Sequence, residues 1–137
     1  MPLSDILCCS DSQVESAITS EEPYSIGVWF QARGIGTIEL ATLGELLQVG
    51  SYDELFDGFV AVGEPLEEGP WPEVIPLGLV EALKNISDSQ VASVTPEWSQ
   101  IEEFYGGVSP EHLAEYLINL RRFLVANQGS YYLVNDL

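Results

Sequence analysis

The chain has 137 residues, of which 46% are hydrophobic and three are tryptophan, and its 22 acidic residues against 4 basic ones give a formal net charge of −18. A surface of this charge repels phosphate, which excludes nucleic-acid binding through a basic footprint. Disordered chains combine high charge with few aromatic residues, so this composition favours a folded chain. No apolar run approaches the roughly 18 residues of a membrane span, and the length predicts a single domain over residues 1–137.

The N-terminal sequence MPLSDILCCSDS indicates a cytoplasmic protein. No basic residue precedes its short apolar stretch, whereas a secretory signal peptide begins with a basic region. Cys8 and Cys9 are adjacent, no third cysteine is present, and neighbouring cysteines rarely pair with each other. We therefore expect two reduced thiols, buried as small apolar side chains in a reducing compartment.

The first half of the chain predicts alternating strands and helices. Ser10 and Gln13 form a capping-box pattern that predicts a helix start, and the β-branched and aromatic run SIGVWFQA predicts a strand. The stretch SYDELFDGFV predicts a further turn of helix and then a short apolar segment. The elements expected here are a strand or first helical turn at 3–9, a helix at 11–19, a strand at 25–32 and a helix at 37–48.

Residues 63–72, GEPLEEGPWP, contain three prolines and two glycines and are expected to form the longest loop. Beyond this loop the pattern is helical. Proline, serine or threonine stands at each predicted helix start, because these residues cap or suit the first turn. The helices expected here begin at Pro76, at Ser87 (ending near Val94), at Thr95-Pro96 (reaching Tyr105) and at Ser109-Pro110 (ending before Gly129).

The last helix is followed by a predicted strand at 130–135, after the terminating Gly129. Together these elements predict an α+β fold: a mostly helical single domain with a small antiparallel sheet. The strands at 25–32 and 130–135 are expected in that sheet, with 3–9 as a candidate third strand.

The middle of the chain carries the candidate partner-binding residues. Between Arg33 and Lys84 there are ten acidic residues and no basic one. An aromatic side chain among acids is a good anchor for a basic protein, and Trp71 stands beside such acids; the alternative for Trp71 is that it folds over the core. The predicted partner-binding residues are Asp53, Glu54, Asp57, Glu64, Glu67, Glu68, Trp71 and Glu73. The alternative for the whole acidic stretch is solubility alone.

Residue types that could carry catalysis are sparse, and no cofactor or metal ligand set is predicted. His112 and Glu115 are three residues apart on a predicted helix, but the H-E-x-x-H pattern of zinc sites is absent. The pairs Glu67-Glu68 and Glu102-Glu103 are adjacent in sequence, and adjacent residues do not face each other on a helix. These side chains are therefore expected to be solvated.

The C-terminal third resembles the YfbM-like family of uncharacterised bacterial proteins, through the stretches LVEALKNISDSQV, EEFYGGVS and EHLAEYLINLRRFLVANQGSYYLV. The N-terminal SDSQVESAI is similar to the first helix of that family. The family's Met-Ile-Gly opening strand and its D-K-x-W-x-x-L-H segment are missing, and GIGTIELATLGELL stands where the latter is expected. The resemblance covers about half the chain; it implies an α+β cytoplasmic domain and supplies no activity.

Three functional hypotheses follow from the sequence. The first is a non-enzymatic acidic interaction protein, in its most concrete form an immunity- or antitoxin-like inhibitor of a basic partner such as a nuclease. The second is a carboxylate-based hydrolase or metal-dependent enzyme of unknown substrate. The third is a helical module that self-associates; the sequence leaves the oligomeric state open.

Overall fold

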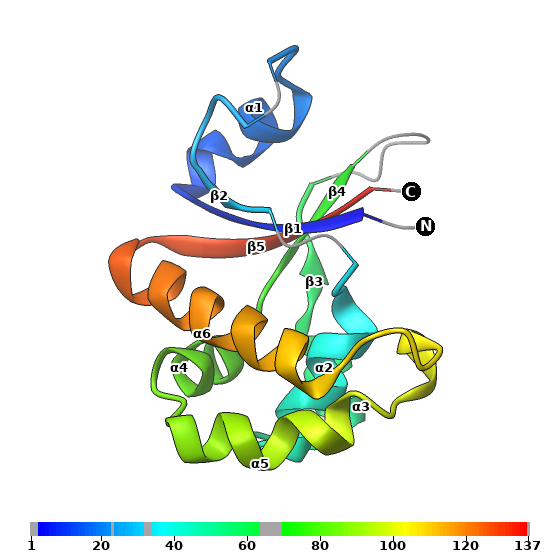
Figure 1. The fold of residues 1–137 in the computed structure, drawn as a ribbon. Coiled ribbons are helices and arrows are strands. Elements are labelled where there is room, and N and C mark those ends of the chain that lie inside the picture. The colour runs from blue at the N-terminus through cyan, green and yellow to red at the C-terminus, as the bar shows by residue number, and fades with distance from the viewer. Residues whose placement is uncertain (1–2, 23, 32–33, 64–69, 137) are drawn as a thin grey trace.

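Five antiparallel strands form one sheet in the computed structural model, which describes residues 3–22, 24–31, 34–63 and 70–136 (Figure 1). The strand order across the sheet is β2-β1-β5-β4-β3. The strands are β1 (Leu3–Cys9), β2 (Val28–Phe30), β3 (Val60–Ala61), β4 (Trp71–Val74) and β5 (Ser130–Asp136). The two longest strands, β1 and β5, lie in the centre and pair along their whole length, from Leu3 opposite Asp136 to Cys9 opposite Ser130.

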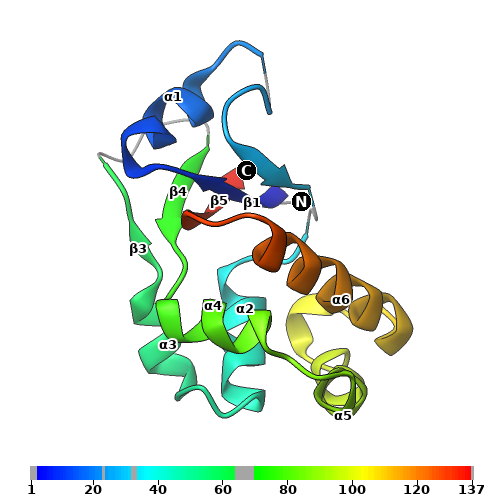
Figure 2. The same cartoon turned by 90° about the vertical axis from the view of Figure 1, so that its left-hand side faces the viewer.

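Helices cover both faces of this sheet, unequally. Figures 1 and 2 show η1 and α1 on one face and α2 to α6 on the other. The helices are η1 (Asp11–Gln13), α1 (Val14–Thr19), α2 (Thr37–Leu46), α3 (Tyr52–Gly58), α4 (Leu77–Lys84), α5 (Asp88–Trp98), η2 (Glu102–Phe104) and α6 (Pro110–Ala126). The predicted α+β class, with a small antiparallel sheet, is confirmed.

The alternation of side chains along β1 and β5 divides the buried residues into two clusters. Ile6, Cys8 and Leu133 belong to the large cluster beneath α2 to α6. Leu7 and Cys9 belong to the small cluster beneath α1. Both thiols are free and buried, as the sequence predicts, and burial raises the pKa of each. These cysteines therefore behave as apolar side chains rather than as reactive thiolates.

Helix α6 is formed and positioned as its sequence predicts. The Oγ of Ser109 accepts the backbone N–H of His112 at 3.1 Å, and Pro110 occupies the first turn. One stripe of the helix is at most 1% exposed and packs into the large cluster; its members are Leu113, Leu117, Leu120 and Leu124. The apolar stripe thus holds α6 against the sheet and against α4 and α5.

Two predicted elements end or begin elsewhere. The strand expected at 25–32 is limited to β2, since Gly27, with φ +80°, breaks the extended backbone just before Val28. The predicted end of the loop at 63–72 is wrong, because Trp71 and Pro72 belong to β4. Residues 64–69 lie outside the described structure. Pro72 has no backbone N–H to donate to a neighbouring strand. Its carbonyl oxygen still accepts the N–H of Val62 at 3.0 Å, which ties β4 to the chain after β3.

The predicted helix boundary at Thr95-Pro96 is also wrong. Helix α5 continues through Pro96 to Trp98. The missing N–H of Pro96 removes one helical bond, but the Oγ1 of Thr95 donates to the Val91 carbonyl at 2.9 Å and the Ser99 N–H donates to the Thr95 carbonyl at 2.9 Å. The helix expected to reach Tyr105 is reduced to the single turn η2.

The indole of Trp98 ties the helical layer together. Trp98 is fully buried, and its Nε1–H donates to the Glu39 carbonyl at 2.9 Å, which links α5 to α2.

No helix of the described residues has both the length and the apolar character needed to cross a bilayer.

We expect Leu120→Ala to lower the free energy of unfolding by about 2–5 kcal/mol, because it leaves a cavity beneath the sheet. Val125 lies on the same helix and is 60% exposed, so Val125→Ala should cost less than about 0.5 kcal/mol. Urea unfolding followed by circular dichroism measures both. Equal losses in the two variants would contradict the packing described for α6.

Candidate functional site

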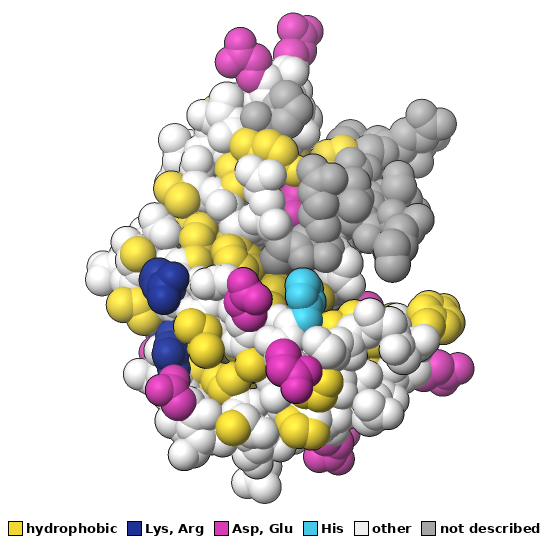
Figure 3. Space-filling model, in the orientation of Figure 1, with side chains coloured by type: hydrophobic (Ala, Val, Ile, Leu, Met, Phe, Trp, Pro, Cys, Tyr) yellow, Lys and Arg dark blue, Asp and Glu magenta, His cyan; other side chains and the backbone are white. Residues whose placement is uncertain are grey.

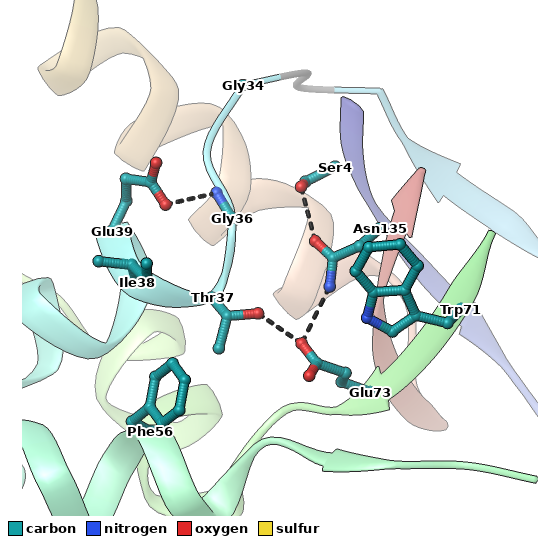
Figure 4. Close-up of a pocket in the computed structure, with 10 residues that line it drawn as sticks. All are labelled: Ser4, Gly34, Gly36, Thr37, Ile38, Glu39, Phe56, Trp71, Glu73 and Asn135. Atoms are coloured by element: carbon teal, nitrogen blue, oxygen red, sulfur yellow. Dashed lines mark hydrogen bonds between the residues drawn. The ribbon is translucent and has the colours of Figure 1, made fainter. Parts of the chain in front are cut away.

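A pocket of about 320 Å³ opens where the sheet meets the N-terminus of α2 and one side of α3 (Figure 4). We call it the Glu73 pocket, after the carboxylate that its polar side chains orient. Its lining residues are Ser4, Gly34, Gly36, Thr37, Ile38, Glu39, Phe56, Trp71, Glu73 and Asn135. They come from β1, β4, β5, α2, α3 and the segment before α2, so the pocket exists only in the folded chain.

The floor of the pocket is a row of residues across three neighbouring strands. Asn135 of β5 lies opposite Ser4 of β1 on one side and opposite Trp71 of β4 on the other. Ser4 and Asn135 are 4% and 7% exposed. Because polar side chains at this depth must be hydrogen-bonded, the Ser4 hydroxyl donates to Asn135 Oδ1 at 2.7 Å. This bond fixes which way the Asn135 amide points.

The orientation of Asn135 in turn fixes the carboxylate of Glu73. Asn135 Nδ2 donates to Glu73 Oε1 at 2.9 Å, and the Thr37 hydroxyl donates to the same oxygen. Two donors satisfy both lone pairs of Oε1. The other oxygen, Oε2, has no hydrogen-bond partner among the described residues. Glu73 therefore presents one free carboxylate oxygen in a fixed position.

Two aromatic side chains accompany this carboxylate. Trp71 is half-buried and lines the pocket from β4. Phe56 lines it from α3, is 42% exposed and stacks on Tyr52 with the ring centroids 5.8 Å apart and the planes at 23°. The pocket therefore combines a negative charge with aromatic rings, which is the combination that recognises cations.

A second carboxyl group, that of Glu39, lines the same pocket. Its Oε2 accepts the Gly36 N–H at 3.1 Å and so caps α2. Burial raises the pKa of Glu39; hydrogen bonds from the backbone N–H groups of Glu39 and Gly36 oppose the rise, and the charge of Glu103 adds to it. The half-buried Glu39 is thus a carboxyl group whose ionisation costs more than that of an exposed one.

Phe56 connects the pocket to the surface of α3, where its ring stacks on Tyr52. The pKa of Tyr52 is raised by desolvation and then by the charges of Glu103, Asp53 and Glu39, so these four residues lie within electrostatic reach of one another. We call this surface the acidic–aromatic face and define it by Glu39, Tyr52, Asp53, Phe56, Asp57 and Glu103. Residues 50 positions apart in the sequence meet here.

The described basic residues lie at the other end of the molecule. Lys84 stands over the Tyr131 ring at 5.2 Å, and Arg121 donates to the Ile86 carbonyl and pairs with Asp88. In Figure 3 the dark-blue side chains appear at the left of the view, over α6, and the right-hand end shows acidic and hydrophobic ones. The acidic–aromatic face therefore has no described basic neighbour to neutralise it.

The predicted partner-binding residues are distributed over this region. Asp53, Glu54 and Asp57 are exposed on α3. Trp71 and Glu73 lie on β4, in the pocket rather than on a free surface, and Trp71 is neither a loop residue nor fully buried. Glu64, Glu67 and Glu68 lie outside the described residues. Their role as a set stays a prediction.

The residues weighed for catalysis are placed as follows. His112 and Glu115 are both exposed on α6, and Glu102 and Glu103 are exposed on η2. The described part of the chain contains no group of three or more His, Cys, Asp or Glu side chains that could hold a metal ion.

Sequence reasoning missed Ser4, Thr37 and Asn135, which orient the carboxylate of Glu73, and also Phe56. A signal for two of them was present: Ser4 and Asn135 are polar residues in the inward-facing phase of predicted strands, two residues from Ile6 and Leu133. The two polar residues lie opposite each other because of the register of β1 against β5. That register cannot be read from the sequence.

No family model, curated protein or solved structure matches the chain. The resemblance to the YfbM-like family stays a prediction, and the function must be argued from the pocket and the face themselves.

We expect Glu39→Gln to raise the free energy of unfolding at pH 7 by about 0.5 kcal/mol, because an amide keeps the cap on Gly36 without a buried charge. A carboxyl whose pKa is raised by folding stabilises the protein only when it is protonated. The gain should therefore disappear as the pH falls through the raised pKa of Glu39 toward the ordinary value of 4.5. Urea unfolding at pH 7 and pH 4 tests this; a gain of equal size at both pH values would contradict the burial of the charge.

Proposed function

We propose that this chain is a non-enzymatic interaction protein that binds a basic protein partner through the acidic–aromatic face and the adjoining Glu73 pocket. The observation that carries the proposal is the stack of Tyr52 on Phe56 at the edge of the Glu73 pocket, with the charges of Glu103, Asp53 and Glu39 acting on Tyr52 and the described Arg121 paired elsewhere, with Asp88.

The two kinds of side chain have separate tasks in this proposal. The carboxylates attract and orient a positively charged protein and raise the rate of association. Phe56 and Tyr52 supply apolar contact area, which provides most of the affinity of a typical interface. Lys84, Arg121 and Arg122 lie on α4 and α6, so the molecule has a charge asymmetry that favours one docking orientation.

A finer form of the proposal is an immunity- or antitoxin-like inhibitor that acts in the cytoplasm. A basic nuclease binds phosphates through lysine and arginine side chains. A surface of carboxylates competes for those side chains, so the acidic–aromatic face would block substrate access by occupying the phosphate-binding surface of the enzyme. The YfbM-like resemblance is compatible with a cytoplasmic setting and does not name a partner.

The test compares three forms of the protein as affinity baits in lysate of the source cell. The site variant carries Asp53→Asn, Asp57→Asn and Glu103→Gln. The control variant carries Glu15→Gln, Glu97→Gln and Glu115→Gln, which remove the same charge from exposed positions on α1, α5 and α6. Quantitative mass spectrometry identifies proteins retained by each bait.

We expect a basic protein that wild type and control retain and that the site variant binds about tenfold more weakly or not at all. Its affinity for wild type should fall as the salt concentration rises, because salt screens the exposed carboxylates. A partner retained equally by all three forms, or one whose binding is independent of salt, would contradict the proposal.

A second candidate function is a carboxylate-based hydrolase, and one observation favours it. Glu39 and Glu73 line the same pocket, and burial raises the pKa of Glu39, as it does in general acids. The test is an assay against chromogenic glycosides, esters and phosphates. Hydrolysis that is lost in both Glu39→Gln and Glu73→Gln would support this function, whereas hydrolysis that survives both changes, or no hydrolysis of any substrate, would count against it.

A further inference from the structure

We propose that the Glu73 pocket receives the ammonium group of a single lysine side chain from the partner. This inference rests on the proposed function for the source of the lysine, but the recognition of an alkylammonium group by the pocket is measured independently of any partner. It assigns the pocket a ligand class and distinguishes it from the exposed carboxylates of α3.

The first argument is the charge of the pocket. Glu73 is half-buried, yet the described residues place no basic side chain in salt-bridge contact with it. The other charged group that lines the pocket, Glu39, is also an acid. The described groups that bond to Glu73, Thr37 and Asn135, are neutral, so its negative charge is available to a cationic ligand. An anionic ligand is excluded by the same two carboxylates.

The second argument is the arrangement that holds the carboxylate. Ser4 and Asn135 are both more than nine-tenths buried, and they serve to orient Glu73 through the chain Ser4 Oγ to Asn135 Oδ1 and Asn135 Nδ2 to Glu73 Oε1. The Thr37 hydroxyl completes the contact from α2. Figure 4 shows Asn135 and Thr37 converging on one oxygen of Glu73, with Ser4 bonded to Asn135. A carboxylate held by residues from three other elements, β1, β5 and α2, is positioned in advance of binding, which lowers the entropy cost of binding.

The single free oxygen of Glu73 suits lysine better than arginine. A guanidinium binds a carboxylate best through both oxygens in a bidentate fork. At Glu73 the Thr37 and Asn135 donors already occupy Oε1, and only Oε2 remains. A compact ammonium group needs a single acceptor oxygen. The geometry therefore suits lysine, whose aliphatic stem lies against aromatic rings while the charge meets the carboxylate.

Trp71 and Phe56 provide that aromatic surface. Both rings line the pocket, and a cation near an aromatic face gains cation–π stabilisation. The pocket volume of about 320 Å³ lies at the small end of ligand sites and accommodates one extended side chain rather than a large cofactor.

The experiment is a titration of the isotopically labelled protein, followed by NMR, with Nα-acetyl-lysine-N-methylamide. The reporters are the Trp71 indole N–H and the Asn135 side-chain amide. We expect saturable shifts of both with a dissociation constant on the order of 1–10 mM, as is usual for so small a ligand. The arginine counterpart should bind about threefold or more weakly, and the Nε-acetylated lysine counterpart, which has no charge, should not bind.

Two variants locate the binding. Glu73→Gln removes the charge and keeps an acceptor for Thr37 and Asn135, so it should fold and bind lysine at least about tenfold more weakly. Glu97→Gln removes one charge from an exposed position on α5, outside the pocket, and should bind within about twofold of wild type. If Glu73→Gln fails to fold, Phe56→Ala replaces a 42% exposed ring and should weaken binding several-fold by removing the aromatic wall.

Three results would overturn the inference: no saturable shift at roughly tenfold the expected dissociation constant, arginine binding as tightly as lysine, or equal binding by Glu73→Gln and Glu97→Gln. The failure of the proposed function is distinguishable from these. If the acidic–aromatic face retains a basic partner but the pocket does not bind lysine, only this inference is refuted. If the pocket binds lysine but no basic partner is found, only the proposed function is refuted. If Glu73→Gln also weakens binding of the captured partner, this supports the partner as the source of the lysine. If the partner binds Glu73→Gln as well as wild type, that source is refuted.

Discussion

The pairing of β1 with β5 is the constraint on which the rest of the structure depends. These strands join residues about 130 positions apart and form the middle of the sheet, so both helical layers are built on them. Their register places Ser4 opposite Asn135 and turns both toward α2. A slip of one residue would turn Asn135 to the opposite face and bring apolar Val134 in its place. The same hydrogen-bonded ladder therefore sets the division of the two apolar clusters and the position of the Glu73 carboxylate.

Charge is distributed unevenly over this frame. The carboxylates of Glu39 and Glu73 are held by hydrogen bonds from neutral donors. In a protein with equal numbers of acidic and basic residues, salt bridges could take this role. Among the described basic side chains, Arg121 of α6 instead donates to the Ile86 carbonyl, between α4 and α5. Because the carboxylates are satisfied by dipoles and not neutralised, their negative potential remains available at the surface.

The sequence predicts well what depends on neighbouring residues, and poorly what depends on distant ones. The Ser109-Pro110 start and the leucine stripe of α6 are local signals, and the structure agrees with them. Strand β4 was not predicted, since Pro72 within it and Pro70 just before it are typical of loops, and its pairing with β5 depends on contacts far along the chain. At the site, Trp71 and Glu73 were singled out as partner-binding residues of the acidic middle of the chain, Trp71 within the predicted loop and Glu73 just after it. Their placement beside Asn135 and Thr37 depends on three separate strand and helix contacts, which no spacing in the sequence encodes.

The outer strands of the sheet are short: β2 has three residues and β3 has two. An edge strand exposes unpaired backbone groups that can recruit another chain, and long flat edges lead to aggregation. Here the long strands are internal, and each edge offers only a few free N–H and C=O groups, in a chain whose net charge of −18 makes copies repel one another. Among the described residues, this arrangement leaves little backbone for edge-to-edge pairing between copies, although Val28, Val60 and Phe56 are exposed.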